Sequence, residues 1–142
     1  MRILLAVDGS KHSMEAVEFL VSHPGWLRET PELHLVTVHL PVPKLPGMGA
    51  AVGKAQIDKY YQEESERCLV DARKKLDAAG VRYEVHTLVG AVAESLVKHA
   101  KDKRCDLICI GTRGHSELGK ALVGSTATKV MHISDVPVLL VK

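Results

Sequence analysis

The chain has 142 residues, 46% of them hydrophobic and 25% charged, which fits one folded domain and excludes a disordered tail, a collagen or a coiled-coil rod. Lysine and arginine number 19 against 17 aspartates and glutamates, so the formal net charge is only +2, and aromatic residues make up 4%. So weak a charge and so few rings argue against nucleic-acid binding through a basic patch or stacked bases.

Five short apolar runs are predicted to be β-strands. In chain order they are Ile3–Val7, Leu33–Leu40, Val81–Val89, Leu107–Ile110 and Val136–Val141. The first, fourth and fifth are nearly continuous, as expected for strands that helices cover on both faces of a parallel sheet.

The four segments between these runs carry helical patterns. The apolar stripes are Met14, Val17, Leu20 and Val21 in the first, Ile57, Tyr61, Cys68, Ala72, Leu76 and Ala79 in the second, Ala93, Leu96, Val97 and Ala100 in the third, and Ala127, Val130, Met131 and Ser134 in the fourth. Strands that alternate with helices predict an α/β fold with a five-stranded parallel sheet. We expect a single domain over residues 1–142.

Residues 41–53, which contain three prolines and three glycines, form an irregular connection after the second predicted strand. Two interpretations stay open at this stage. The segment is either a plain surface linker or a flexible lid that closes over a ligand.

The number of cysteines and the lengths of the apolar runs indicate the cellular compartment of the protein. The three cysteines (Cys68, Cys105 and Cys109) are an odd number in a chain that needs no disulfide framework, which favours a reducing compartment. The first apolar run is too short for a signal peptide, and no run approaches the ~18 residues of a membrane span. We expect a soluble, cytoplasmic protein with no membrane partner.

A phosphate-binding arrangement is predicted where the parallel strands end, the edge at which such sheets bind ligands. Gly111 and Gly114 follow the fourth strand, and Arg113 between them could supply positive charge. Gly124 and the hydroxyl residues Ser125 and Thr126 open the last helix. Free N–H groups and the positive dipole end of a helix favour an anion there, and glycine lets it approach the main chain.

The spacing Gly111-x-x-Gly114, nine further residues and Gly124-Ser125 resembles the nucleotide-binding signature of the universal stress proteins. The likeness extends over the chain: Val7-Asp8 ends the opening strand, His39-Leu40 ends the second, Gly90 precedes the third helix, and Val136–Val141 closes the chain. It implies a flavodoxin-like (adenine nucleotide alpha hydrolase-like) three-layer sandwich with sheet order 3-2-1-4-5.

The same resemblance implies a set of ligand contacts. Ala6, Val7, Asp8 and Leu40 would surround adenine and ribose, Ile110 would line the base pocket, Gly111 and Gly114 would approach ribose and phosphates, and Gly124, Ser125 and Thr126 would hold the phosphates. The ligand would be ATP together with Mg²⁺, which the phosphates would hold near Asp8. It also implies a homodimer through the last strand, Val136–Val141.

The function these features predict is an ATP-binding, nucleotide-dependent stress regulator or sensor with at most slow hydrolysis, because no general base is aimed at a γ-phosphate. The alternative is a dimeric interaction module of the same fold with an empty crevice. A flavin carrier is disfavoured because no ring lies near the end of the fourth strand.

Two other kinds of site are excluded or disfavoured. The stretch from Gly114 to Lys120 nearly matches a P-loop, but Ala121 stands where that motif needs a hydroxyl for Mg²⁺. Cys105 and Cys109 lie ~13 Å apart on an extended strand and cannot share a zinc ion. The eight histidines follow no metal-binding motif, and we expect most of them at the surface.

Overall fold

A computed structural model describes residues 1–26, 29–43, 53–112 and 123–142. Its strands are β1 (Arg2–Ala6), β2 (Glu32–His39), β3 (Tyr83–Val89), β4 (Leu107–Gly111) and β5 (Val138–Val141). All pairs are parallel and the order is β3-β2-β1-β4-β5, so both the five predicted strands and the expected sheet order are confirmed.

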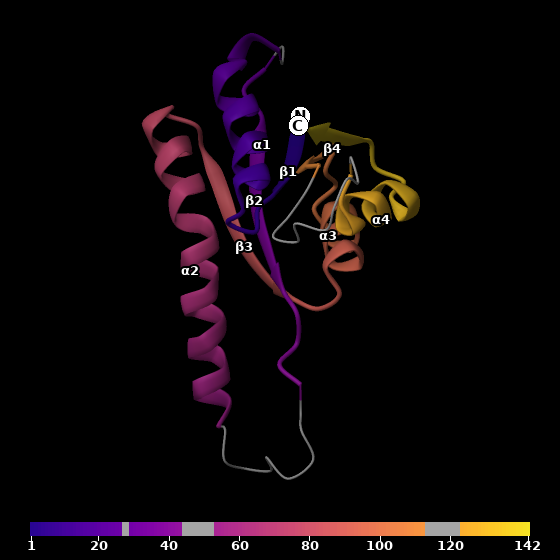
Figure 1. Ribbon diagram of the computed structural model, residues 1–142. Coiled ribbons are helices and arrows are strands. Elements are labelled where there is room, and N and C mark those ends of the chain that lie inside the picture. Colours follow the sequence, from indigo (N-terminus) through magenta and orange to yellow (C-terminus); the bar gives the residue numbers. More distant parts are fainter. Residues whose placement is uncertain (27–28, 44–52, 113–122) are drawn as a thin grey trace.

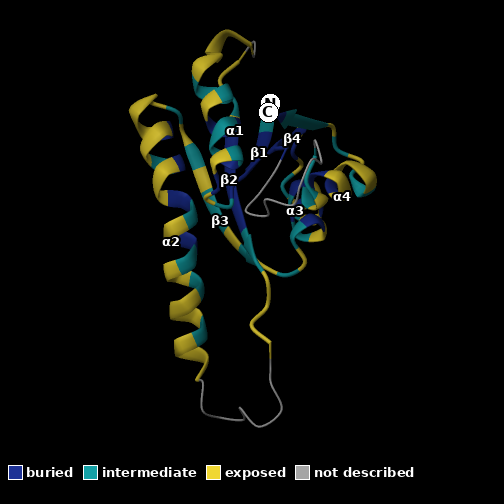
Figure 2. Ribbon diagram, viewed as in Figure 1, coloured by how far each residue is buried: buried dark blue, intermediate teal, exposed yellow. Residues whose placement is uncertain are grey.

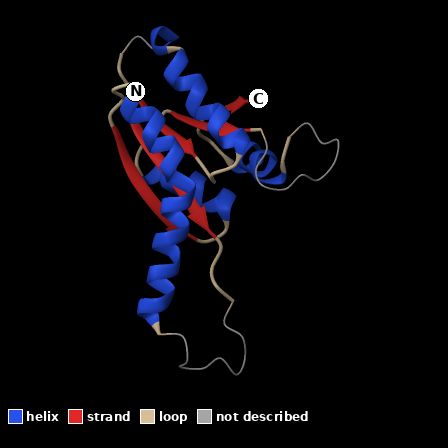
Figure 3. Cartoon of the chain, turned by 60° about the vertical axis from the view of Figure 1, so that its left-hand side comes forward, coloured by secondary structure: helices blue, strands red, loops and turns tan. Residues whose placement is uncertain are grey.

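Helices cover both faces of this sheet in three layers (Figures 1 and 3). The helices α1 (Lys11–Ser22) and α2 (Lys54–Ala78) pack on one face, and α3 (Val92–Asp102) and α4 (Ser125–Ile133) pack on the other. A short 3-10 helix, η1 (Pro24–Trp26), follows α1. Among the described residues, no helix is both long and apolar enough to cross a membrane.

The continuous apolar runs are explained by burial on both sides of the sheet (Figure 2). In the central strand β1, Ile3 and Leu5 pack beneath α1 and α2, whereas Leu4 and Ala6 pack beneath α3 and α4. Ile3, Leu4 and Leu5 have no exposed surface at all. Side chains alternate across a strand, so a strand covered on both faces needs apolar residues at successive positions.

Local sequence signals explain where α1 begins and ends and where α2 ends. The Ser10 side chain caps α1 by accepting a hydrogen bond from Ser13 N (3.2 Å), and α1 stops before Pro24. Gly80 follows the C-cap of α2 with a φ of +67°, a left-handed conformation that glycine adopts without strain.

The buried face of α2 differs from the predicted stripe. The structure buries Ser65, Leu69, Ala72 and Leu76, while Ala79 is exposed and Cys68 is only half-buried. The N-terminal turns of α2, at the bottom of Figure 1, extend past the ends of the strands. These turns do not pack against the sheet. An apolar stripe fitted to the whole length of α2 therefore does not coincide with the face that contacts the sheet.

Candidate functional site

A cleft opens at the carboxyl edge of the sheet, where β1, β2 and β4 end beside α3 and α4. Its described lining residues are Ala6, Val7, Asp8, Ser13, Val38, Val92, Leu96, Ile110, Gly111, Thr112, Gly124, Ser125, Thr126 and Ala127. The floor and one wall are apolar, and the polar groups gather where β1 and β4 meet the starts of α1 and α4. Such a cleft suits a ligand with an apolar planar part and a polar tail.

The end of β4 and the start of α4 are joined directly by main chain. Gly124 N donates a hydrogen bond to Thr112 O (2.6 Å), and Thr112 N donates to Val141 O (2.8 Å) in β5. These bonds bring the two glycine-containing segments together at one side of the cleft. They also occupy the amide of Gly124, so a ligand would have to use the amides that follow it.

The first turn of α4 has no side-chain cap from its own N-cap residue. Gly124 is that residue, in an extended conformation, and as glycine it has no side chain to bond to the first amides. Ser125 is exposed and Thr126 half-buried, and both line the cleft. Uncapped N–H groups and the helix dipole make this end favourable for an anion.

Gly111 has a packing reason to be glycine. A Cβ added there would lie 2.2 Å from His12 O and 2.6 Å from His12 C, so the end of β4 passes directly against the main chain of α1. The sequence interpretation assigned this glycine to close approach of a ligand. In the structure, close approach of the protein's own helix already requires it.

Asp8 lies at the mouth of the cleft in a hydrogen-bonded turn. Ser10 N donates to Asp8 Oδ1 (2.9 Å), and Ser13 Oγ donates to Ser10 O (2.9 Å). Ser10, not Asp8, therefore caps α1. Ser10 and Ser13 thus shape the start of the helix, while the Asp8 carboxylate borders the cleft.

The structure brings together eight of the predicted ligand residues. These are Ala6, Val7, Asp8, Ile110, Gly111, Gly124, Ser125 and Thr126. Leu40 is 68% exposed beyond the end of β2 and does not line the cleft; Val38, two residues earlier, does. Arg113 and Gly114 lie outside the described residues, as does most of the 41–53 segment.

Sequence reasoning missed the walls contributed by Val38, Val92 and Leu96. The first turn of the third helix could have been included, because it directly follows the carboxyl end of β3. Val38 follows from strand alternation once Ala6 and Ile110 are assigned to one face of the sheet.

Two further described residues that could carry chemistry, His39 and Cys109, do not line the cleft. His39 hydrogen-bonds to Ser65 Oγ on α2 (2.8 Å). Burial raises the pKa of the Cys109 thiol to about 12, so it stays protonated at neutral pH. Of the seven described histidines, His23 and His132 are exposed, four are partly exposed and only His34 is buried, which accords with the prediction that most lie at the surface.

Comparison with known proteins assigns the family. The sequence model of the universal stress protein family matches residues 1–142, and the chain belongs to that family. It is 31% identical over 142 residues to the universal stress protein MJ0531 of Methanocaldococcus jannaschii, covering 99% of this chain and 81% of that protein. It is 32% identical to Slr1230 of Synechocystis over 97% of this chain, which spans 41% of that longer protein.

Solved structures agree with the fold. The universal stress protein UspA from Lactobacillus plantarum superposes with a TM-score of 0.79 at 17% identity, over 100% of this chain and 97% of that one. A universal stress protein crystallised in complex with cAMP superposes with a TM-score of 0.67 at 25% identity, over 100% of this chain and 96% of that one.

Proposed function

We propose that this chain binds an adenine nucleotide, ATP with Mg²⁺, in the cleft at the carboxyl edge and acts as a nucleotide-dependent regulator or sensor. One observation carries the proposal: the uncapped start of α4 faces the same cleft as the ends of β1 and β4. The relative crystallised with cAMP gives the ligand class.

The phosphates would lie at the start of α4. The amides of Ser125 and Thr126 belong to the helix's first turn, whose N–H groups have no partner within the helix. Their hydroxyls add two further donors beside these amides. A phosphate group can accept several such bonds at once, and the helix dipole adds to the attraction.

The adenine ring would lie against the apolar wall. Ala6 and Ile110 come from adjacent strands in direct register, and Val38 extends the same face from β2. Val92 and Leu96 of α3 close the other side. A flat heterocycle fits between such walls because its two faces bury apolar surface against them.

Asp8 is the carboxylate among the described lining residues, and Mg²⁺ binds through one or two carboxylates together with the phosphates of its nucleotide. Asp8 would thus hold the ion beside the phosphates. Because Asp8 is also the only described titratable group in the lining and is tied to Ser10 N, we propose at most slow hydrolysis.

Calorimetric titration of the full chain with ATP, AMP and cAMP, each with and without Mg²⁺, tests the proposal. We expect saturable 1:1 binding, and tighter binding of ATP when Mg²⁺ is present. Mass spectrometry of any small molecule retained through purification gives an independent readout. Absence of binding heat for all three nucleotides, together with no retained adenylate, would leave the interaction module as the better description.

We further propose a homodimer formed through β5. Ile108 N on β4 donates to Pro137 O (2.9 Å), and Thr112 N, directly after β4, donates to Val141 O (2.8 Å). Residues 137 and 141 thus face β4, and the alternate residues Val138 and Leu140 direct their amides toward the opposite edge of β5. An open apolar edge favours pairing with a second strand.

Light scattering is expected to give twice the 15.5 kDa mass of the chain, and hydrogen exchange at Val138 and Leu140 is expected to slow as protein concentration rises. A monomer mass at every concentration, with fast exchange at both amides, contradicts this assembly. A cytoplasmic location completes the proposal and accords with three free cysteines, two of them buried.

A further inference from the structure

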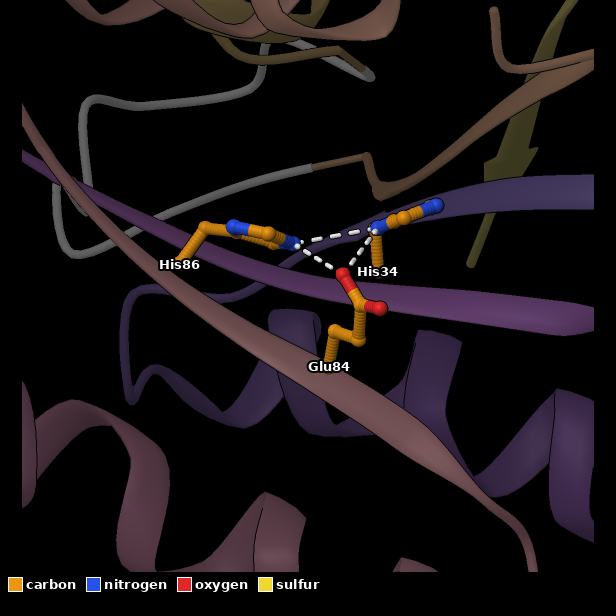
Figure 4. A group of neighbouring side chains, drawn as sticks. All are labelled: His34, Glu84 and His86. Carbon is orange, nitrogen blue, oxygen red and sulfur yellow. Dashed lines mark hydrogen bonds and ion pairs between the residues drawn. The ribbon is translucent and has the colours of Figure 1, made fainter. Parts of the chain in front are cut away.

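Figure 4 shows a cluster of histidine and glutamate side chains. It lies near the amino ends of β2 and β3, on the α3–α4 face of the sheet and away from the cleft, because His34 is in register with Leu4 and the His86 ring contacts His99 of α3. It consists of His34 on β2 and Glu84 and His86 on β3. Strand pairing places His34 beside Glu84, and the two-residue spacing of Glu84 and His86 puts both on one face. The ligand atoms of the three residues all lie within 4.8 Å of one another.

The distances between these atoms match the spacing around a bound metal ion. His34 Nδ1 and His86 Nε2 are 3.0 Å apart, Glu84 Oε2 is 3.6 Å from His34 Nδ1, and it is 3.5 Å from His86 Nε2. Tetrahedral ligands at roughly 2.0–2.1 Å from zinc are separated from one another by about 3.3–3.4 Å. The triangle therefore needs shifts of only a few tenths of an ångström (about 0.2–0.4 Å by the same geometry) to hold such an ion.

Hydrogen bonding alone leaves this cluster incompletely satisfied. One proton can be shared between the two rings, but Glu84 Oε2 stands outside the usual hydrogen-bond range of about 2.7–3.2 Å from both of them. His34 is only 2% exposed, and its Nε2 is buried without a hydrogen-bond partner among the described residues. The Glu84 carboxylate thus lies beside two rings without a hydrogen bond to either of them.

A metal on His34 Nδ1 would fix the ring proton on its other nitrogen. With Nδ1 coordinated, Nε2 carries the proton and faces Glu32 Oε1 at 3.6 Å. Metal-binding histidines commonly present their second N–H to a carboxylate, which fixes the ring orientation. Glu32 is itself held by Arg2 Nε at 2.9 Å.

The cluster is partly accessible from solvent, which leaves a path for an ion to enter. The Glu84 side chain is 59% exposed, while that of His86 is 16% exposed. An ion can thus reach the site from the Glu84 side.

We propose that His34 Nδ1, His86 Nε2 and Glu84 Oε2 bind one zinc-class divalent transition-metal ion, with water in the fourth position. This site is separate from the nucleotide cleft and does not depend on the proposed function. Lys103 Nζ, 3.6 Å from Glu84 Oε2, is a competing cation and would have to move aside when the ion binds.

The test uses the full chain stripped with a chelator and then titrated with Co²⁺ or Zn²⁺. One Co²⁺ per chain should give the visible d–d bands of a tetrahedral site, and Zn²⁺ should displace it. Competition with a chromophoric chelator should show Zn²⁺ binding weakened at least ~100-fold by Glu84→Gln and by His86→Gln, more than the loss typical of an outer-shell partner. Lys103→Gln should strengthen Zn²⁺ binding about 10-fold by removing the competing charge.

His132→Gln is the matched control, because His132 is exposed on α4 and lies outside the cluster. Glu84→Gln changes a mainly exposed side chain, so circular dichroism should show that this variant is folded. A substitution of the buried His34, by contrast, is expected to disturb packing. Zn²⁺ affinity equal in wild type, Glu84→Gln and His86→Gln, or reduced as much by His132→Gln, overturns the proposal. Nucleotide affinity should be unchanged in Glu84→Gln, which separates this test from that of the cleft.

Discussion

Replacing Gly111 with alanine is expected to lower the free energy of unfolding by about 3 kcal/mol, the upper part of the usual range for overpacking. The added Cβ would meet His12 O at 2.2 Å and His12 C at 2.6 Å, and both are main-chain atoms that cannot rotate away. Relief requires α1 to move from the end of β4. Chemical denaturation monitored by circular dichroism measures the loss.

Gly25→Ala is the control for this substitution. Gly25 lies in η1, its φ is not left-handed, and an added Cβ there meets nothing within 4 Å. We expect its stability to stay within about 0.5 kcal/mol of wild type, as for most surface changes. Equal stability of the Gly111 and Gly25 variants would mean that β4 and α1 do not approach as closely as described.

Replacing Ser125 with aspartate is expected to weaken ATP binding about 100-fold, which corresponds to ~2.7 kcal/mol, because a second negative charge would lie where the phosphates are proposed to bind. The same charge favours the helix, since carboxylates at a helix N-terminus are worth ~0.3–1 kcal/mol. The variant should therefore be folded and at least as stable as wild type. Calorimetry gives the affinity and thermal unfolding the stability.

Two comparisons sharpen this second test. Thr128→Asp adds the same charge three residues later on α4, at an exposed position that does not line the cleft, and should change ATP affinity far less. Adenosine, which carries no phosphate, should bind the Ser125 variant as it binds wild type. If ATP binds the Ser125 variant with undiminished affinity, the phosphates do not lie at the start of α4.

The strands were predictable because their environment is uniform. Ile3, Leu4 and Leu5 are buried whichever face they point to, so a continuous apolar run predicts the strand without any knowledge of its neighbours. The helix α2 was harder, because only part of its length contacts the sheet. Ser65, buried and hydrogen-bonded to His39, breaks the apolar pattern on the very face that packs.

The cleft can be predicted from the sequence, whereas the histidine cluster cannot. Asp8, Gly111 and Gly124 each follow or precede an element whose end can be predicted, so their common edge could be inferred. His34 and His86 come together only through the register of β2 and β3, 52 positions apart in the chain. The two histidines belong to no sequence motif, so a search for metal ligands at short spacings in the sequence does not find them.

The place of β1 in the middle of the sheet has a consequence for how the protein reaches its native state. One of its neighbours, β4, is more than a hundred residues away, as the bond from Arg2 N to Asp106 Oδ2 with its separation of 104 residues shows. During synthesis, most of the polypeptide must therefore leave the ribosome before β4 can pair with β1. Such long-range pairing slows folding, and until it forms the nascent apolar strand exposes surface that favours aggregation.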